Sequence, residues 1–174
     1  MKLKIYQVDA FTDKPFSGNP AAVCVLEGRR DVNWMQNVAK EMNLSETAFL
    51  IPKLDGYELR WFTPTTEVNL CGHATLASAH ILWEEGYLDK GRIAKFFSKS
   101  GLLTARLNGS WTELDFPAAE PEEVEMPTEI IKALNIKPIY WGKSIYYIFE
   151  VDSDQLVRTI EPDFKLLKEV LNCG

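Results

Sequence analysis

A cysteine, a glycine and a histidine stand side by side in the segment CGHATLAS, residues 71–78. The small and apolar residues that follow them favour a helix. A helix start offers unpaired backbone N–H groups and the positive end of the helix dipole, and a glycine lets a ligand approach the backbone closely. Since a carboxylate is a natural ligand for such a place, the segment predicts an anion-binding helix start at Gly72 and His73.

Two more side chains of this helix have chemistry that a site could use. Cys71, beside the positive end of the dipole, could have a lowered pKa and act as an acid or a base. His80 lies on roughly the same helix face as His73, about 10 Å further along the axis by the standard helical rise. The alternative for both Cys71 and His80 is burial as packing residues, so Cys71 is a secondary candidate for the site.

Two polar residues flank apolar strands elsewhere in the chain. Glu46, in NLSETAFL, stands at the start of an apolar strand. Burial there would raise its pKa towards neutrality and suit it for general acid–base catalysis. The alternative is a capping or solvent-facing glutamate at a helix–strand junction. Asn19, in FSGNPAAV, either caps a turn that feeds a strand or reaches a ligand.

Short strands and helices must hold these residues. Strands are predicted over residues 3–9, 21–26, 45–51, 57–62, 96–98, 102–107, 112–115, 139–140 and 144–151, and helices over residues 32–42, 72–85, 128–134 and 163–171. Strand 21–26 is continuously apolar, so we expect it to be covered on both faces. Helix 72–85 is small or apolar on almost every face, so we expect it to be buried.

An acidic, proline-rich segment, PAAEPEEVEMP at residues 117–127, is the best linker in the chain. After it, GKSIYYIFEVDSD and PDFKLLKEVL present a glycine, a strand, an acidic turn and a helix. The same order occurs earlier, in GNPAAVCVLEGRRD and DVNWMQNVAKEM. The pattern indicates two structural copies, of which the second stops after its first helix.

Composition excludes several classes of function. The chain has 174 residues, a net charge of −6 and no basic stripe, which argues against a nucleic-acid partner. Its apolar runs are too short to span a membrane, and residues 1–25 carry charges that no signal peptide has. Three widely spaced cysteines, Cys24, Cys71 and Cys173, indicate free thiols in a reducing compartment. We therefore expect a cytoplasmic protein that acts on a small molecule.

Three stretches in this order, VDAFTDKPFSGNPAAVCVL, MNLSETAFL and RWFTPTTEVNLCGHATLASAHIL, resemble the PhzF-like phenazine-biosynthesis isomerase family. The resemblance implies the α+β fold of diaminopimelate epimerase. That fold has two similar lobes, each a strongly curved, mostly antiparallel sheet wrapped around a central helix, with the active site between them. Residues 1–117 would form the first lobe, with helix 72–85 at its centre. Residues 118–174 would form the linker and an incomplete start of the second lobe.

The resemblance also implies roles for particular residues. The catalytic acid–base of the family falls on Glu46 and the histidine of its motif on His73. The backbone amides of Gly72 and His73 would help to hold the substrate carboxylate, and the GNP motif, residues 18–20, would line the cleft with Asn19. The implied reaction moves a proton on a small cyclic carboxylic acid without a metal or an organic cofactor.

This chain departs from the family in length. The second lobe of the family supplies a catalytic aspartate and a stretch similar to GDPATGSA, and neither motif occurs here. We therefore expect a chain truncated in its second lobe, with little or no isomerase activity by itself. A homodimer or other self-association is expected, because the missing part would leave apolar surface uncovered.

Two other functions stay open. CGH also resembles the cysteine motifs of proline racemase and diaminopimelate epimerase, which would make the protein a cysteine-dependent amino-acid racemase or epimerase. Such enzymes need two opposed thiols, whereas Cys173 has the wrong sequence context and Cys24 lies in mid-strand. The other alternative is a non-catalytic half-protein that binds a ligand or oligomerises.

Overall fold

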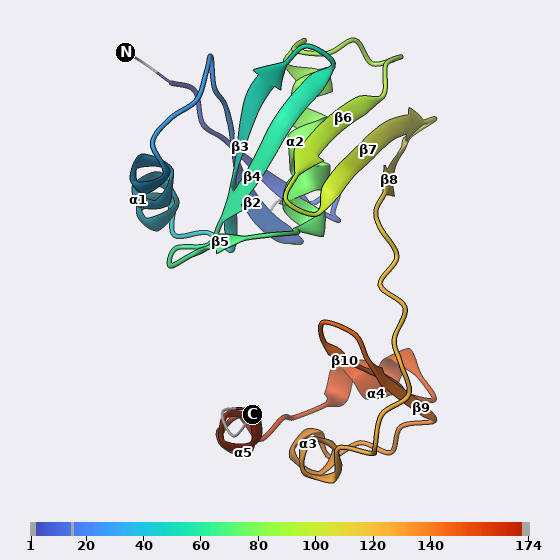
Figure 1. Cartoon of the computed structure of the whole chain (residues 1–174). Helices are drawn as coiled ribbons and strands as arrows, with labels where there is room; N and C mark the ends of the chain where they lie inside the picture. Colours follow the sequence, from blue (N-terminus) through green and yellow to red (C-terminus); the bar gives the residue numbers. More distant parts are fainter. Residues whose placement is uncertain (1–2, 15, 172–174) are drawn as a thin grey trace. The chain divides into compact units, whose positions relative to one another are not determined.

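The structure, a computed structural model, describes residues 3–14 and 16–171. The chain divides into two compact units, residues 1–117 and 118–174, each of which has its own sheet (Figure 1). Within the described ranges, no helix combines the length and the apolar character needed to cross a bilayer.

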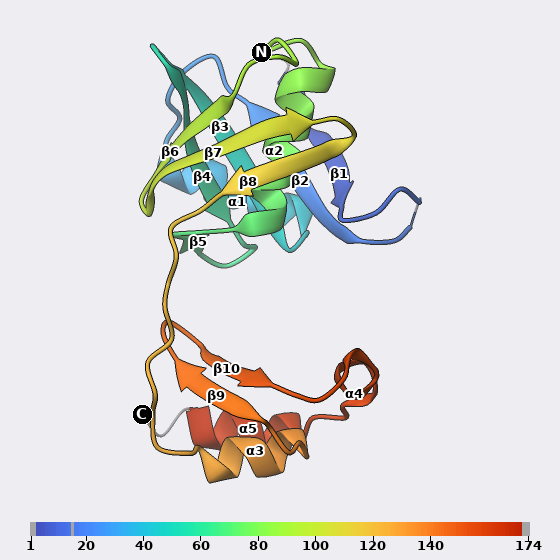
Figure 2. The ribbon, with the colours of Figure 1, turned by 90° about the vertical axis from the view of Figure 1, so that its right-hand side faces the viewer.

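One eight-stranded sheet forms the framework of the first unit. Its strands are β1 (Tyr6–Ala10), β2 (Asn19–Val25), β3 (Glu46–Lys53), β4 (Gly56–Phe62), β5 (Glu67–Val68), β6 (Ala94–Ser98), β7 (Gly101–Asn108) and β8 (Trp111–Asp115). They follow the order β1-β2-β3-β4-β6-β7-β8, and β5 pairs with β4. The pairs β2–β3 and β4–β6 are parallel and the others antiparallel. The sheet curls around one helix, which confirms the predicted fold class (Figure 2).

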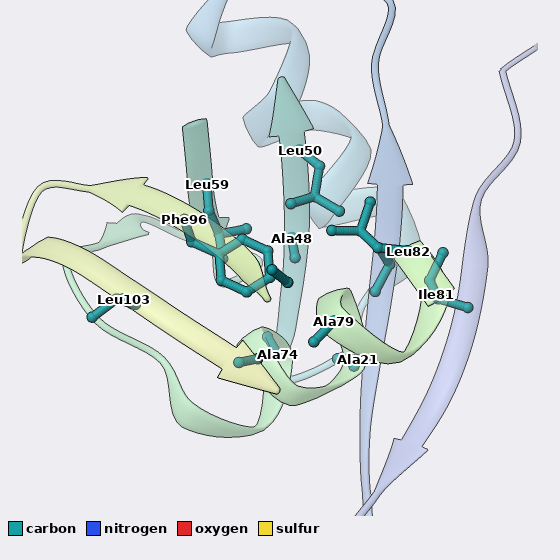
Figure 3. Packing of buried hydrophobic residues seen from close by; sticks show 14 of the residues in the cluster. Ala21, Ala48, Leu50, Leu59, Ala74, Ala79, Ile81, Leu82, Phe96 and Leu103 are labelled. Carbon is teal, nitrogen blue, oxygen red and sulfur yellow. The ribbon is translucent and has the colours of Figure 1, made fainter. Parts of the chain in front are cut away.

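That central helix is α2 (Gly72–Glu84), and its burial confirms the expectation from its apolar faces. Nine of its residues are buried: His73, Ala74, Thr75, Ala77, Ser78, Ala79, Ile81, Leu82 and Trp83. Figure 3 shows Ala74 and Ala79 on the helix, in the same cluster as Ala21 and Ala48 on the strands. Small side chains on both elements let the helix approach the sheet closely, so the helix start is held firmly against the strand ends.

A second helix, α1 (Val32–Met42), belongs to a separate cluster on the other face of the sheet. The side chain of Asp31 caps it by accepting hydrogen bonds from the backbone N–H groups of Asn33 at 2.9 Å and Trp34 at 3.2 Å. Along β2, Val23 packs in the α2 cluster and Cys24 in the α1 cluster. The continuously apolar strand is therefore covered on both faces, as its sequence predicts.

Two predictions about the first unit are wrong in detail. Strand β2 begins at Asn19 although Asn and Pro disfavour strands, because pairing of Asn19 with Ala10 and of Pro20 with Asp9 overrides that preference. His80 is exposed on α2, so its interpretation as a buried packing residue is wrong. The short strand β5 was not predicted from the sequence, because two residues are too few to show a pattern.

The second unit consists of α3 (Thr128–Leu134), β9 (Tyr140–Lys143), β10 (Tyr147–Glu150), α4 (Asp154–Thr159) and α5 (Phe164–Leu171). Strands β9 and β10 form an antiparallel hairpin. Helix α4, capped by the Ser153 hydroxyl, intervenes between β10 and α5, where the first unit passes directly from β2 to α1. The two element orders therefore agree less closely than the sequence pattern suggests.

Self-association is expected from the second unit, whose described residues include only two buried hydrophobic side chains, Ile130 and Ala133. Its large exposed hydrophobic residues are Met126, Ile139, Tyr140, Ile145, Tyr146, Ile148, Val157 and Phe164. We expect the 174-residue chain to show a concentration-dependent sedimentation coefficient, because association removes apolar surface from water. The double variant Ile145→Ser/Tyr146→Ser should weaken association, whereas Leu54→Ser in the first unit should not. A chain that sediments as a monomer at all concentrations would contradict this prediction.

Candidate active site

Three side chains with acid–base chemistry converge where β3 and α2 begin. Glu46 is the first residue of β3, Cys71 is the N-cap residue of α2, and His73 lies in the first turn of that helix. His73 Nε2 lies 3.1 Å from Glu46 Oε2, and His73 Nδ1 lies 3.4 Å from Cys71 Sγ. The imidazole therefore contacts the carboxylate with one ring nitrogen and the thiol with the other.

The contact between Glu46 and His73 is close but is not aligned as a hydrogen bond. Glu46 Oε2 and His73 Nε2 are both buried and have no hydrogen-bond partner among the described residues. The side chains are 19% and 9% exposed, so water reaches them poorly. An unsatisfied buried polar group costs about 1–3 kcal/mol, so both atoms would gain from a ligand that completes their hydrogen bonding.

The parallel pairing of β2 with β3 brings Asn19 to the same end of the sheet. Ala21 lies opposite Glu46 in the register, so Asn19 precedes the Glu46 position on the neighbouring strand. The Ser45 hydroxyl donates a hydrogen bond of 3.1 Å to Asn19 Oδ1 and thereby ties the two strand ends together. Sequence reasoning missed Ser45, although its place beside Glu46 in NLSETAFL was the available signal.

The two glycines near the site serve different purposes. Gly18 has a φ of +76°, and a Cβ atom there would overlap the carbonyl oxygen of Ala10. The turn before β2 therefore requires this glycine. At Gly72, a Cβ atom would meet only a ring carbon of Phe116, at an ordinary contact distance of 3.7 Å. Packing does not require a glycine at Gly72, which agrees with the expectation that a ligand approaches the backbone there.

Gly72→Ala should weaken ligand binding at the helix start without weakening the fold. The helix should form at least as well, because alanine stabilises a helix by roughly 0.5–1 kcal/mol relative to glycine. The added methyl group should hinder an anion at the backbone N–H groups and weaken the binding of benzoate or sulfate by about tenfold, which is about 1.4 kcal/mol. Calorimetric titration and thermal unfolding measure the two effects. Unchanged anion affinity would mean that the helix start is not the binding place.

The thiol of Cys71 is not activated by its position. Burial raises the pKa of Cys71 to about 12, and the nearby Glu46 carboxylate adds to this shift. The helix start alone suggested a lowered pKa, but the loss of solvent around the sulfur outweighs the dipole. Burial also raises the pKa of Cys24 to about 11. Both groups are therefore neutral thiols near pH 7, and Cys173 lies outside the described residues.

A surface pocket of about 340 Å³ lies apart from these residues. One carboxylate of the lining, Glu58, pairs with Arg29 and Lys53. Two lining cations, Arg60 and Lys99, share the carboxylate of Glu67. The lining residues include no histidine or cysteine. The pocket is an ion-pair network rather than a second acid–base site.

Comparison with known proteins places this chain in a family. Residues 8–173 match PhzC-PhzF, described as phenazine biosynthesis-like protein. The chain belongs to this family. A PhzF-family crystal structure from Enterococcus faecalis superposes with a TM-score of 0.87 at 41% identity, covering 97% of this chain and 64% of that one. A predicted epimerase of Pseudomonas aeruginosa, 20% identical with a TM-score of 0.74, shares the fold.

The names of several relatives of this PhzC-PhzF member state a reaction class or a domain family but no substrate. An uncharacterized isomerase of Halalkalibacterium halodurans is 55% identical over 172 residues, which is 98% of this chain and 65% of that protein. An uncharacterized isomerase of Pseudomonas aeruginosa is 45% identical over 97% of this chain. The human phenazine biosynthesis-like domain-containing protein is 44% identical over 142 residues. The chain thus spans slightly less than two thirds of the length of the bacterial relatives it matches.

Proposed function

We propose that this protein is an isomerase of the PhzF type, which moves a proton on a small cyclic carboxylic acid with Glu46 as the acid–base group. The observation that carries the proposal is the unpaired contact of Glu46 Oε2 with His73 Nε2. A carboxylate oxygen that is buried and not hydrogen-bonded is available to take a proton from a substrate carbon. The relatives named as isomerases support this class of reaction.

Three groups of this chain take part in the proposed reaction. The substrate carboxylate binds backbone N–H groups at the start of α2, close to Gly72 and His73, with Asn19 at the neighbouring strand end. Glu46 takes the proton from one substrate carbon and returns it to another, so no net proton is gained or lost. His73 Nε2 lies 3.1 Å from Glu46 Oε2 and borders the carboxylate on one side. Positioning of this kind supplies much of the rate enhancement in such reactions.

A two-thiol racemase fits the described residues less well. Cys71 belongs to the α2 cluster and Cys24 to the α1 cluster, so these two thiols lie on opposite faces of the sheet. Both thiols are also neutral near pH 7 because burial raises the pKa of each. Glu46 is therefore the better candidate for the proton-transfer group.

Hydrogen exchange with solvent tests the proposal directly. The protein, in a version that carries the additional sequence present in its relatives, is incubated in D₂O with a panel of small cyclic carboxylic acids. Deuterium at carbon, followed by NMR, should appear only with protein present. Absence of exchange across the panel, together with tight binding of the same acids, would favour the non-catalytic alternative.

Cys71→Ser should retain most of this exchange activity. The reason is that Cys71 is a neutral thiol with no opposed thiol among the described residues, so serine replaces it at a modest packing cost. Cys24→Ser, a substitution of the other buried thiol, serves as the matched control for that cost. Complete loss of exchange in Cys71→Ser, with an unchanged melting temperature, would assign the protein to the cysteine-dependent epimerases instead.

A further inference from the structure

We propose that Glu46, Cys71 and His73 form a three-ligand site for a thiophilic divalent cation of the zinc class, which leaves a fourth coordination position open. The ion is a reversible ligand that occupies Glu46, not a resident cofactor of the reaction. Binding of the ion does not depend on the proposed function. Only the consequence, inhibition of proton transfer, rests on it.

The donor atoms are of the kinds that zinc prefers. One carboxylate oxygen, one thiol sulfur and one imidazole nitrogen lie within 4.8 Å of one another. Bond lengths of about 2.0–2.3 Å in a tetrahedral zinc site place such atoms roughly 3.3–3.6 Å apart. The imidazole now contacts the carboxylate and the thiol with different nitrogens, so side chains must rotate until one ring nitrogen faces both ligands. Magnesium and calcium require oxygen ligands and fit this set poorly. Three protein ligands with an open position are the usual arrangement of a reactive zinc site.

The surroundings of the three groups favour an ion of charge +2. Glu46 Oε2 and His73 Nε2 lack hydrogen-bond partners among the described residues, and coordination would satisfy one or both of them. Cys71 loses its proton to solvent as the sulfur–metal bond forms. The thiolate and the carboxylate then balance the charge of the ion in a site that contains little water.

Within the described part of the chain, this combination of ligand side chains occurs at one place. Among the residues that the structure describes, this is the one group of three or more histidine, cysteine, aspartate or glutamate side chains close enough to hold an ion. His80, the other histidine, is exposed on α2, and Cys24 packs in the α1 cluster. Neither residue can replace a ligand of the group without a large rearrangement.

Cobalt titration of the 174-residue chain tests binding without any activity assay. The background variant is Cys24→Ser/Cys173→Ser, which leaves Cys71 as its one thiol. One equivalent of Co²⁺ should produce a thiolate-to-cobalt charge-transfer band and the visible bands of tetrahedral cobalt, and Zn²⁺ should displace it. Cys71→Ser in this background should abolish the charge-transfer band and raise the zinc Kd by at least about 100-fold.

Substitutions of the other two ligands test the site even if Cys71→Ser folds poorly. Glu46→Gln keeps the shape of the side chain and should weaken zinc binding about tenfold or more, since it replaces an anionic ligand. His73→Gln should weaken binding similarly, whereas His80→Gln, on the same helix, should not change it. A charge-transfer band that survives Cys71→Ser, or a zinc affinity that none of the three ligand substitutions lowers, would overturn the proposal.

Inhibition of proton transfer by zinc is measured separately. The protein used is the longer version that carries the additional sequence present in its relatives. If exchange occurs, zinc should suppress it at one equivalent, and a chelator should restore it. If no exchange occurs although cobalt binds, the proposed function is wrong and the metal site stands. If exchange occurs and cobalt does not bind, the metal site is wrong and the proposed function stands.

Discussion

Glu46→Gln is expected to lower solvent-hydrogen exchange into a substrate by about 10²–10⁴-fold, the usual contribution of a general acid–base group. The amide cannot accept or return the proton, while its size and shape are nearly those of the carboxylate. Ligand binding should therefore change little, because the N–H groups of α2 that would bind the substrate are untouched. The rate is measured in D₂O and the affinity by calorimetric titration.

Glu41→Gln provides the matched control for this substitution. Glu41 lies on α1 and is exposed, so its replacement removes the same charge without affecting the site. Both variants should keep the melting temperature within a few degrees of the parent protein. If exchange by Glu46→Gln stays within about threefold of that by the parent and by Glu41→Gln, Glu46 does not transfer the proton.

Leu82→Ala is expected to destabilise the protein by about 2–5 kcal/mol, a large share of the stability of a domain of this size. Leu82 lies on α2 with no exposed surface and packs in the cluster that the curved sheet encloses (Figure 3). Removal of the side chain leaves a cavity that the surrounding strands cannot fill completely. Urea unfolding followed by circular dichroism measures the change in the free energy of unfolding.

Leu54→Ala is the control, since Leu54 is fully exposed between β3 and β4. The same atoms are deleted there without a cavity, so the free energy of unfolding should change by less than about 0.5 kcal/mol. Equal effects of the two substitutions would mean that α2 is not the centre of the cooperative core.

Much of the fold followed from local patterns in the sequence. Residues 72–84 form a buried helix because small and apolar residues occupy nearly every face, and this feature is visible without any partner element. Asp31 caps α1 because its side chain reaches backbone N–H groups only two and three residues away. Strand β2 extended further than predicted because its first residues depend on pairing with β1, a contact that no local pattern contains.

The candidate site was predictable in part. The motifs around Glu46 and His73 resemble one family, and the match over residues 8–173 confirms that family. The roles of these residues stay predictions. The pKa of Cys71 was expected to be lowered by the helix start, and burial raises it instead. Burial depends on α2 packing inside the sheet, so no local pattern around Cys71 reveals it.

The sequence by itself determined most of the helices and strands, the family and the identity of the residues with acid–base chemistry, because these depend on side-chain type and short-range spacing. Only the tertiary structure decided that Glu46 and His73 approach within 3.1 Å without a hydrogen bond, and that Cys71 completes a three-ligand group. Glu46 begins β3 and His73 lies in the first turn of α2, so β4 and β5 intervene between them in the chain. Their separation is set by the packing of a helix within a curved sheet, a long-range property that neighbouring residues do not encode.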